Sequence, residues 1–185
     1  ALPINNFRRT KLDDSKPVSG DTYNELLLKQ RKGCYLCPIR CKRGIALEHP
    51  KYGVDSRYGG PEYETIAALG TNLNILDLKA IAKANEICNR YCMDTISAGL
   101  VIAFACECFE KNVITKADTD GLELRFGDPD LMIQLLEMTA KREGFGDLLA
   151  EGVTRLALRW KVADQPYHLG VKCMELPLHD PRVKV

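Results

Sequence analysis

The sequence has almost no net charge and no long apolar run. Its 26 Lys and Arg residues are balanced by 25 Asp and Glu residues, which gives a formal net charge of +1. This balance provides no electrostatic basis for binding nucleic acid or an anionic membrane surface. The longest apolar stretch, 96–108, is interrupted by Ser97 and Glu107 and is shorter than the ~18 residues of a transmembrane helix. We therefore expect no nucleic-acid partner and no membrane span.

The chain also lacks a signal peptide, an initiator methionine, an internal repeat and low-complexity sequence. Its last residues follow a turn signal at Asp180-Pro181, so we expect both ends to continue into a longer protein. The 185 residues match the size of one domain that buries its own core. We therefore expect one domain over residues 1–185.

Cysteine, by contrast, is abundant, with eight residues in this chain. An even number permits disulfides in a secreted protein, but a domain of this length does not depend on them. Four of the cysteines also fall within helical patterns, namely Cys88, Cys92, Cys106 and Cys108. We interpret the compartment as reducing and cytoplasmic, with cysteines that act as metal ligands or small apolar core residues.

The most specific motif is Cys34-x2-Cys37-x3-Cys41, in a basic loop that we place at 33–42. Thiolates at this spacing can surround a soft cation or an iron–sulfur cluster. A [4Fe–4S] cluster needs a fourth ligand, for which Cys173 is a candidate by its position in an extended segment. The alternative is a structural zinc site completed by His49, in a helical domain that mediates interactions.

The rest of the sequence predicts a mostly α fold, an irregular helical domain with long loops. Proline and glycine leave little regular structure at 1–20 and 42–60. Elsewhere apolar residues recur every three or four positions, which is typical of amphipathic helices. We predict helices over 22–31, 61–69, 78–91, 95–111, 129–142 and 147–160, and an extended segment over 168–173.

Two further segments carry candidate site residues. The segment 59–65 places Glu62 and Glu64 on the first turn of a helix. These carboxylates either interact with the helix dipole or act as a general acid or base. The segment 89–94 joins two helices, where Asp94 is expected to cap the second helix and Cys92 lies at an accessible junction.

These segments, in this order, resemble the tungsten-containing aldehyde:ferredoxin oxidoreductase family. Members of that family are much longer than this chain. The resemblance therefore implies the middle helical domain of an enzyme whose N-terminal, pterin-binding domain and third domain are missing. The matching segments are 33–41, 60–65, 69–72, 94–105, 140–152 and 174–177.

The resemblance also implies cofactors and ligands. Cys34, Cys37 and Cys41 match three ligands of a [4Fe–4S] cluster, whose fourth ligand then lies beyond Val185. Cys173 stands where the family more often has glycine, so it is a poorer candidate for that ligand.

The tungsten site is implied by two of the segments. Glu64 matches a glutamate close to the tungsten bis-pyranopterin and is implied to transfer protons. Asn89, Cys92 and Asp94 match a pterin-binding segment whose usual form is Asp-x-x-Gly-Leu-Asp. Lys83 stands where the iron that joins subunits in some relatives has a glutamate, so the resemblance does not extend to that iron.

Cys92 replaces the glycine of the pterin-binding segment. A thiolate is a soft ligand that suits a heavy, soft metal, so we hypothesise that Cys92 ligates tungsten directly. A thiolate-ligated site resembles the tungsten subunit of the ATP-independent benzoyl-coenzyme A reductases more than the aldehyde oxidisers.

The function implied is that of an oxidoreductase. It would couple two-electron chemistry of the aldehyde/carboxylate type, at tungsten or molybdenum, to single-electron transfer through the cluster. The implied partners are ferredoxin or electron-transfer subunits and the missing domains of the same enzyme. Because faces that those domains cover are exposed in the isolated domain, we also expect self-association into a homo-oligomer, and we expect the isolated domain to be inactive.

Overall fold

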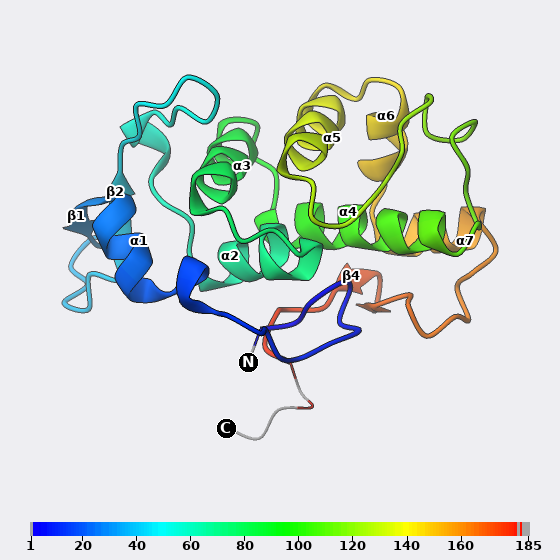
Figure 1. Ribbon diagram of the computed structural model, residues 1–185, viewed down its shortest axis with the longest axis horizontal. Coiled ribbons are helices and arrows are strands. Elements are labelled where there is room, and N and C mark those ends of the chain that lie inside the picture. Colours follow the sequence, from blue (N-terminus) through cyan, green and yellow to red (C-terminus); the bar gives the residue numbers. More distant parts are fainter. Residues whose placement is uncertain (1, 181, 183–185) are drawn as a thin grey trace.

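The computed structural model describes residues 2–180 and 182 and shows a helical domain with two small β-hairpins (Figure 1). Of residues 181–185, the structure describes only Arg182. The expectation that the chain continues past Val185 therefore falls outside the described residues. The described helices are α1 (Gly20–Leu26), α2 (Tyr63–Leu69), α3 (Leu78–Arg90), α4 (Thr95–Glu110), α5 (Pro129–Lys141), α6 (Phe145–Leu149) and α7 (Val153–Arg159).

Four short strands form the hairpins. Strand β1 (Leu28–Lys32) pairs with β2 (Lys42–Ile45), and β3 (Gly170–Val171) pairs with β4 (Met174–Glu175), both antiparallel. Short 3-10 turns lie at Lys16–Val18, Ser56–Tyr58 and Thr71–Leu73. The expected mostly α architecture with long connections is confirmed.

Helix α4 lies at the centre of the core because its sequence is apolar on nearly every face. All residues from Ala98 to Cys108 are buried, and Figure 1 shows α2 and α7 near the two ends of α4, α5 above α4 and α3 above α2. Gly99 allows α2 to come very close, because a Cβ atom on Gly99 would lie 2.6 Å from the carbonyl carbon of Ala68.

Three cysteines belong to this core, as expected. Cys88 on α3 and both Cys106 and Cys108 on α4 are buried, and burial raises the pKa of each thiol to about 12. These thiols are uncharged at neutral pH, so they act as small apolar side chains rather than as thiolate ligands.

The first predicted helix is too long. Helix α1 ends at Leu26, and residues 28–31, which we expected to be helical, belong to strand β1 instead. Strand β2 likewise occupies part of the segment 42–60, where little regular structure was expected. Both segments consist largely of residues with ordinary helix propensity, and the cross-strand pairing of β1 with β2 overrides that local preference.

The last predicted helix is interrupted. Gly152 has φ of 81°, a left-handed conformation that favours glycine, and it separates α6 from α7. The extended segment expected at 168–173 is confirmed in part by strand β3.

No single helix in the described part of the chain is long and apolar enough to cross a membrane. Helices α3 and α4 reach the length and composition of a span only when taken together, and they are bent by 117° relative to each other.

Candidate functional site

The three motif cysteines lie on the loop between β1 and β2. Residues Lys32 and Lys42 are paired at the base of this loop, and inside it the N–H of Cys37 donates to the carbonyl of Cys34 over 3.1 Å. Cys34 and Cys41 are exposed and Cys37 is partly exposed. The hairpin thus brings residues 34–41 into one compact, accessible turn.

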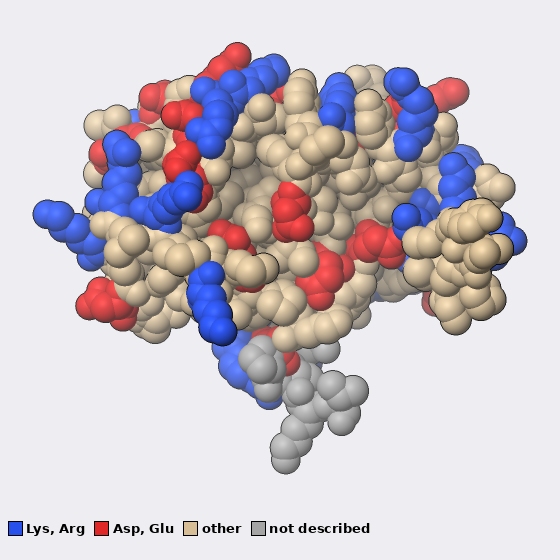
Figure 2. All heavy atoms as spheres, turned by 180° about the vertical axis from the view of Figure 1, so that it is seen from behind, with Lys and Arg blue, Asp and Glu red and all other residues tan. Residues whose placement is uncertain are grey.

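The surroundings of this loop are basic and apolar. Tyr35, Leu36 and Ile39 are 93%, 85% and 76% exposed, and residues 28–47 contain no Asp or Glu. Figure 2 shows Lys and Arg side chains around a tan protrusion at the end of the molecule where Figure 1 places β1 and β2. The cations of this hairpin are Lys29, Arg31, Lys32, Arg40, Lys42 and Arg43.

One ring nitrogen of His49, the candidate fourth zinc ligand, is engaged by its own loop. Its Nδ1 atom accepts hydrogen bonds from the backbone N–H groups of Tyr52 and Lys51, at 3.0 and 3.2 Å, and its ring is stacked on Tyr52. Across residues 2–180 and 182, no three His, Cys, Asp or Glu side chains converge in a ready-made metal site. The motif thiols are therefore gathered on one loop but do not by themselves complete a coordination shell.

Glu64 lies on the first turn of α2, and both of its carboxylate oxygens have contacts. Oε2 accepts a hydrogen bond of 2.7 Å from the N–H of Leu178, and Oε1 lies 3.4 Å from Nδ1 of His179. The segment after β4 therefore covers Glu64 from the other end of the chain.

The segment 89–94 forms a helix C-cap of the Schellman type. The N–H of Cys92 donates to the carbonyl of Asn89, and the N–H of Met93 donates to the carbonyl of Cys88. These are the two bonds that define the motif, which places its C′ residue in the left-handed region and usually has glycine there. Cys92 occupies that position with φ of 56° and is exposed. This left-handed backbone conformation explains why glycine suits the same position in the family that the sequence resembles.

Asp94 caps the next helix, as predicted. Its Oδ1 atom accepts a hydrogen bond of 2.7 Å from the N–H of Ser97. Asn89 does not point freely toward a ligand, because its amide donates to the carbonyl of Tyr58 over 2.8 Å. One of the three predicted pterin-binding residues thus holds the loop before α2.

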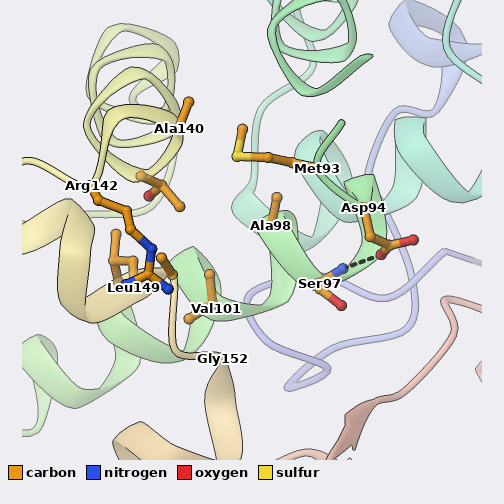
Figure 3. A pocket seen from close by; sticks show the side chains of 11 residues that line it. Met93, Asp94, Ser97, Ala98, Val101, Ala140, Arg142, Leu149 and Gly152 are labelled. Carbon is orange, nitrogen blue, oxygen red and sulfur yellow. Dashed lines mark hydrogen bonds between the residues drawn. The ribbon is translucent and has the colours of Figure 1, made fainter. Parts of the chain in front are cut away.

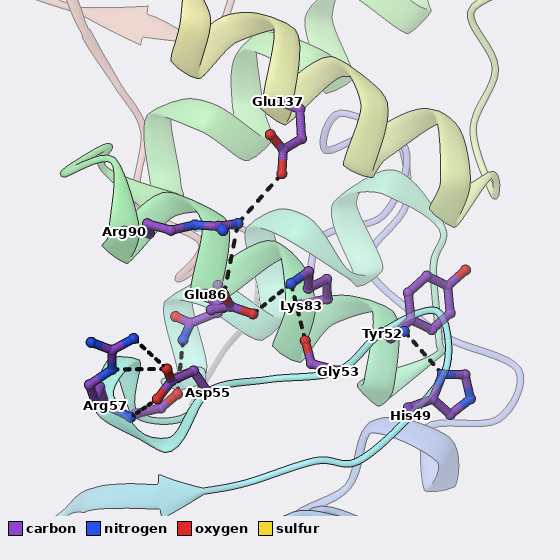
Figure 4. Close-up of polar contacts among 11 residues, drawn as sticks. His49, Tyr52, Gly53, Asp55, Arg57, Lys83, Glu86, Arg90 and Glu137 are labelled. Carbon is purple, nitrogen blue, oxygen red and sulfur yellow. Dashed lines mark hydrogen bonds and ion pairs between the residues drawn. The ribbon is translucent and has the colours of Figure 1, made fainter.

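Helix α3 holds that loop at further points (Figure 4). Lys83 donates to the carbonyl of Gly53 over 3.1 Å and to Glu86 over 2.7 Å. Glu86 is 4% exposed and lies 3.8 Å from Arg90, which in turn contacts Glu137 of α5. The loop that leads to Glu64 is therefore fixed on α3 by hydrogen bonds from Lys83 and Asn89 to its carbonyls, and the buried carboxylate of Glu86 holds Lys83 in place.

The predicted segments meet through two direct contacts. The hydroxyl oxygens of Thr65 and Thr95 lie 2.9 Å apart, which joins the first turns of α2 and α4 directly after Glu64 and Asp94. The N–H of Gly60 donates to the carbonyl of Arg43 over 2.8 Å, which joins the α2 segment to the cysteine hairpin. The fold therefore joins the Glu64 and Asp94 segments directly and links the α2 segment to the strand that follows the cysteine loop.

A pocket of about 370 Å³ opens beside Asp94 (Figure 3). Small side chains of α4 and α5, such as Ala98 and Ala140, line it together with Met93. Arg142 also lines the pocket, and its guanidinium is paired with Asp147 and Glu151. The sequence identified 140–152 only as a segment that matches the family, and the fold shows that it lines the same pocket as Asp94.

The sequence interpretation missed the contacts of the C-terminal segment. Glu175 accepts hydrogen bonds from Ser97 on α4 and from the N–H of Val153 on α7, and His179 reaches Glu64. The only available signal was the motif at 174–177, which gave no indication of its partners.

The residues present fit the implied cofactors in their chemistry. Three thiols suit an iron–sulfur cluster that takes its remaining ligand from elsewhere, and the basic hairpin offsets the negative charge of thiolates. The exposed Cys92 thiol beside Asp94 suits a soft metal or a pterin.

Comparison with known proteins assigns the chain to a family. A family model described as aldehyde ferredoxin oxidoreductase, domains 2 & 3, matches residues 1–185. The chain is 41% identical over 183 residues to the tungsten-containing aldehyde ferredoxin oxidoreductase of Pyrococcus abyssi. This match covers 97% of this chain and 29% of that protein. It is 31% identical over 157 residues to the aliphatic sulfonate oxidoreductase, WOR-like subunit, of Pyrococcus furiosus, covering 85% of this chain and 25% of that protein.

A solved structure has the same fold. The active site complex BamBC of benzoyl coenzyme A reductase, bound to 1,5-dienoyl-CoA, contains a chain that matches with a TM-score of 0.74 and 25% identity, over 96% of this chain and 26% of that one. The chain thus spans only a fraction of the length of its relatives, and the expected helical domain and family resemblance are confirmed. The chain belongs to the aldehyde ferredoxin oxidoreductase family, a family of oxidoreductases.

Proposed function

We propose that the full-length protein is a tungsten-pterin, [4Fe–4S] oxidoreductase that interconverts an aldehyde and a carboxylate and exchanges single electrons with ferredoxin or an electron-transfer subunit. The observation that carries this proposal is the contact of Thr65 with Thr95. This contact joins the first turns of α2 and α4 next to Glu64 and Asp94, and it supports a single site that would combine an acid–base group with a pterin- or metal-binding segment.

Each motif has a separate task in this proposal. When bound, the cofactors supply the two-electron oxidation and the single-electron relay. The thiolates of Cys34, Cys37 and Cys41 hold the cluster at the tip of the hairpin. Asp94 fixes the start of α4, and Glu64, whose Oε2 atom is engaged by Leu178, accepts or releases a proton at Oε1.

The test uses the full-length protein, produced without oxygen in medium that contains tungstate. We expect a brown protein with iron, sulfide and tungsten that oxidises aldehydes with a one-electron dye as acceptor. Serine at Cys34, Cys37 or Cys41 should remove most of the iron. Cys173→Ser is the matched control, because Cys173 is exposed like Cys34 and Cys41 and its replacement is expected to leave the iron content unchanged. A colourless protein with one zinc would favour the structural zinc site instead.

A second candidate function is that of the tungsten subunit of a benzoyl coenzyme A reductase. The exposed thiol of Cys92 at the C′ position favours it, as does the similarity in fold to that enzyme. Cys92→Ser should then lower the tungsten content, and the protein should act on benzoyl-coenzyme A rather than on aldehydes. Unchanged tungsten content and activity in Cys92→Ser would eliminate Cys92 as a ligand.

A further inference from the structure

The carboxylate of Glu64 is held by two consecutive residues from the far end of the chain. The N–H of Leu178 donates to Oε2 over 2.7 Å, and Nδ1 of His179 lies 3.4 Å from Oε1. One oxygen therefore has a fixed backbone donor, whereas the other faces a group that can both give and accept a proton.

The position of His179 suits proton exchange with solvent. Its side chain is 71% exposed, whereas that of Glu64 is 27% exposed. The ring of Tyr63 packs against the imidazole, with centroids 4.9 Å apart and a tilt of 52°. Nδ1 is the ring nitrogen that lies within contact distance of the carboxylate, which leaves Nε2 as the nitrogen for exchange with solvent. An imidazole held in this way contacts the acid through one nitrogen and the outside through the other.

We infer that His179 relays protons between Glu64 and solvent. This inference rests on the proposed role of Glu64 in proton transfer. Glu64, protonated at Oε1, gives its proton to Nδ1 of neutral His179, and the resulting imidazolium releases the Nε2 proton to water. The reverse sequence returns a proton to Glu64, and no electron moves in either direction.

The neighbouring titratable groups do not compete with this relay. Burial raises the pKa of Tyr63, so its phenol stays neutral in the working range of an imidazole. Asp180, next to His179 in the chain, is paired with the guanidinium of Arg182 at 2.7 Å. Its charge is thereby compensated, and Glu64 is the carboxylate that contacts the imidazole.

The first test compares His179→Gln with His168→Gln in the full-length enzyme loaded with its cofactors. His168 is the matched control, because its Nδ1 atom lies 2.9 Å from the carbonyl of Ala163 on a separate loop. We expect His179→Gln to lower kcat roughly 10- to 100-fold with KM changed less than about twofold, and His168→Gln to leave kcat unchanged.

Chemical rescue separates a relay from a purely structural role. Added imidazole should restore part of kcat in His179→Ala, and more basic imidazoles should restore more. A kcat that stays low with every imidazole, or a His179→Gln enzyme that keeps the wild-type rate, would overturn the proposal.

A second readout does not depend on turnover. In the full-length protein labelled with ¹⁵N-histidine and prepared without cofactors, Glu64→Ala should shift both ring nitrogen resonances of His179 and leave those of His168 in place. Unshifted His179 resonances would refute the contact and with it the relay. A protein that shows the shift but oxidises no aldehyde would refute the proposed function and leave the Glu64–His179 pair in place.

Discussion

The hydroxyl oxygens of Thr65 and Thr95 lie 2.9 Å apart and join the first turns of α2 and α4. Each threonine directly follows a candidate site residue, Glu64 in one helix and Asp94 in the other. The relative position of the two site residues therefore depends on how closely these helices pack, and Gly99 sets that distance.

Gly99→Ala should destabilise the protein by about 2 kcal/mol. The added Cβ atom would lie 2.6 Å from the carbonyl carbon and oxygen of Ala68, and backbone atoms cannot give way without separating α2 from α4. Urea unfolding of the variant measures the loss. Gly20→Ala is the matched control, because nothing lies within 4 Å of a Cβ atom at Gly20. Equal stability of both variants would contradict the close packing.

Cys92→Gly should raise the free energy of unfolding by about 0.5–1 kcal/mol. Cys92 has φ of 56°, a conformation that costs an ordinary residue about 1 kcal/mol more than glycine. Thermal unfolding of the apoprotein measures the gain. Cys92→Ala keeps the left-handed strain and should show no gain, so a stabilisation in both variants would point to the thiol rather than to the backbone.

Cys92→Gly also tests whether Cys92 is a ligand of the metal. If Cys92 ligates tungsten, Cys92→Gly should make the apoprotein more stable and the holoprotein poorer in tungsten, because the glycine relieves strain but supplies no donor. Metal analysis of the full-length protein measures the second effect. A variant with full tungsten content would restrict Cys92 to the role of a strained cap residue.

Glu86→Leu should destabilise the protein by about 3 kcal/mol, because it leaves the partly buried ammonium of Lys83 without its carboxylate partner. The double variant Glu86→Leu with Lys83→Met should lose about 1–3 kcal/mol less stability than Glu86→Leu alone. Denaturant unfolding of the four proteins in this cycle gives the coupling energy. Hydrogen exchange at Val54, whose N–H donates to the carbonyl of Leu47 directly after Gly53, should also accelerate in both single variants. Additive losses of stability would show that the pair is not coupled.

Asp180 should contribute stability that disappears in acid. The guanidinium of Arg182 holds the pKa of Asp180 below its usual range, so the folded state favours the carboxylate. A lowered pKa in the folded state gives a contribution that is fully present above about pH 4, the value of an unfolded aspartate, and that is lost as the pH falls through the folded pKa.

Asp180→Asn should therefore cost more stability at pH 7 than at pH 2. Denaturant unfolding at the two pH values measures the difference. Asp13→Asn, at an exposed position, serves as the control and should cost the same at both. A loss in Asp180→Asn that does not depend on pH would show that the ion pair with Arg182 does not contribute.

The structure agrees with the sequence wherever local signals were strong. The sequence alone indicated the apolar period of α3, the near-continuous apolar sequence of α4 and the cap residue Asp94, because side-chain burial and capping act within a few residues. The helix predicted over 22–31 failed where long-range strand pairing overrides a weak local preference. The break at Gly152 was missed because a glycine in a helical pattern is often tolerated.

The sequence by itself determined which residues we propose to carry the chemistry: the three spaced thiols, the acid at Glu64 and the unusual Cys92. These candidates follow from residue type and spacing, and the family resemblance rests on the same residues. Only the tertiary structure decided what these residues touch. In the fold, the amide of Asn89 donates to the carbonyl of Tyr58 and Cys92 adopts a left-handed conformation at the end of α3. His179 contacts Glu64, which lies 115 positions earlier in the chain. Such contacts depend on how helices pack, because side chains distant in the sequence meet only after the core has formed.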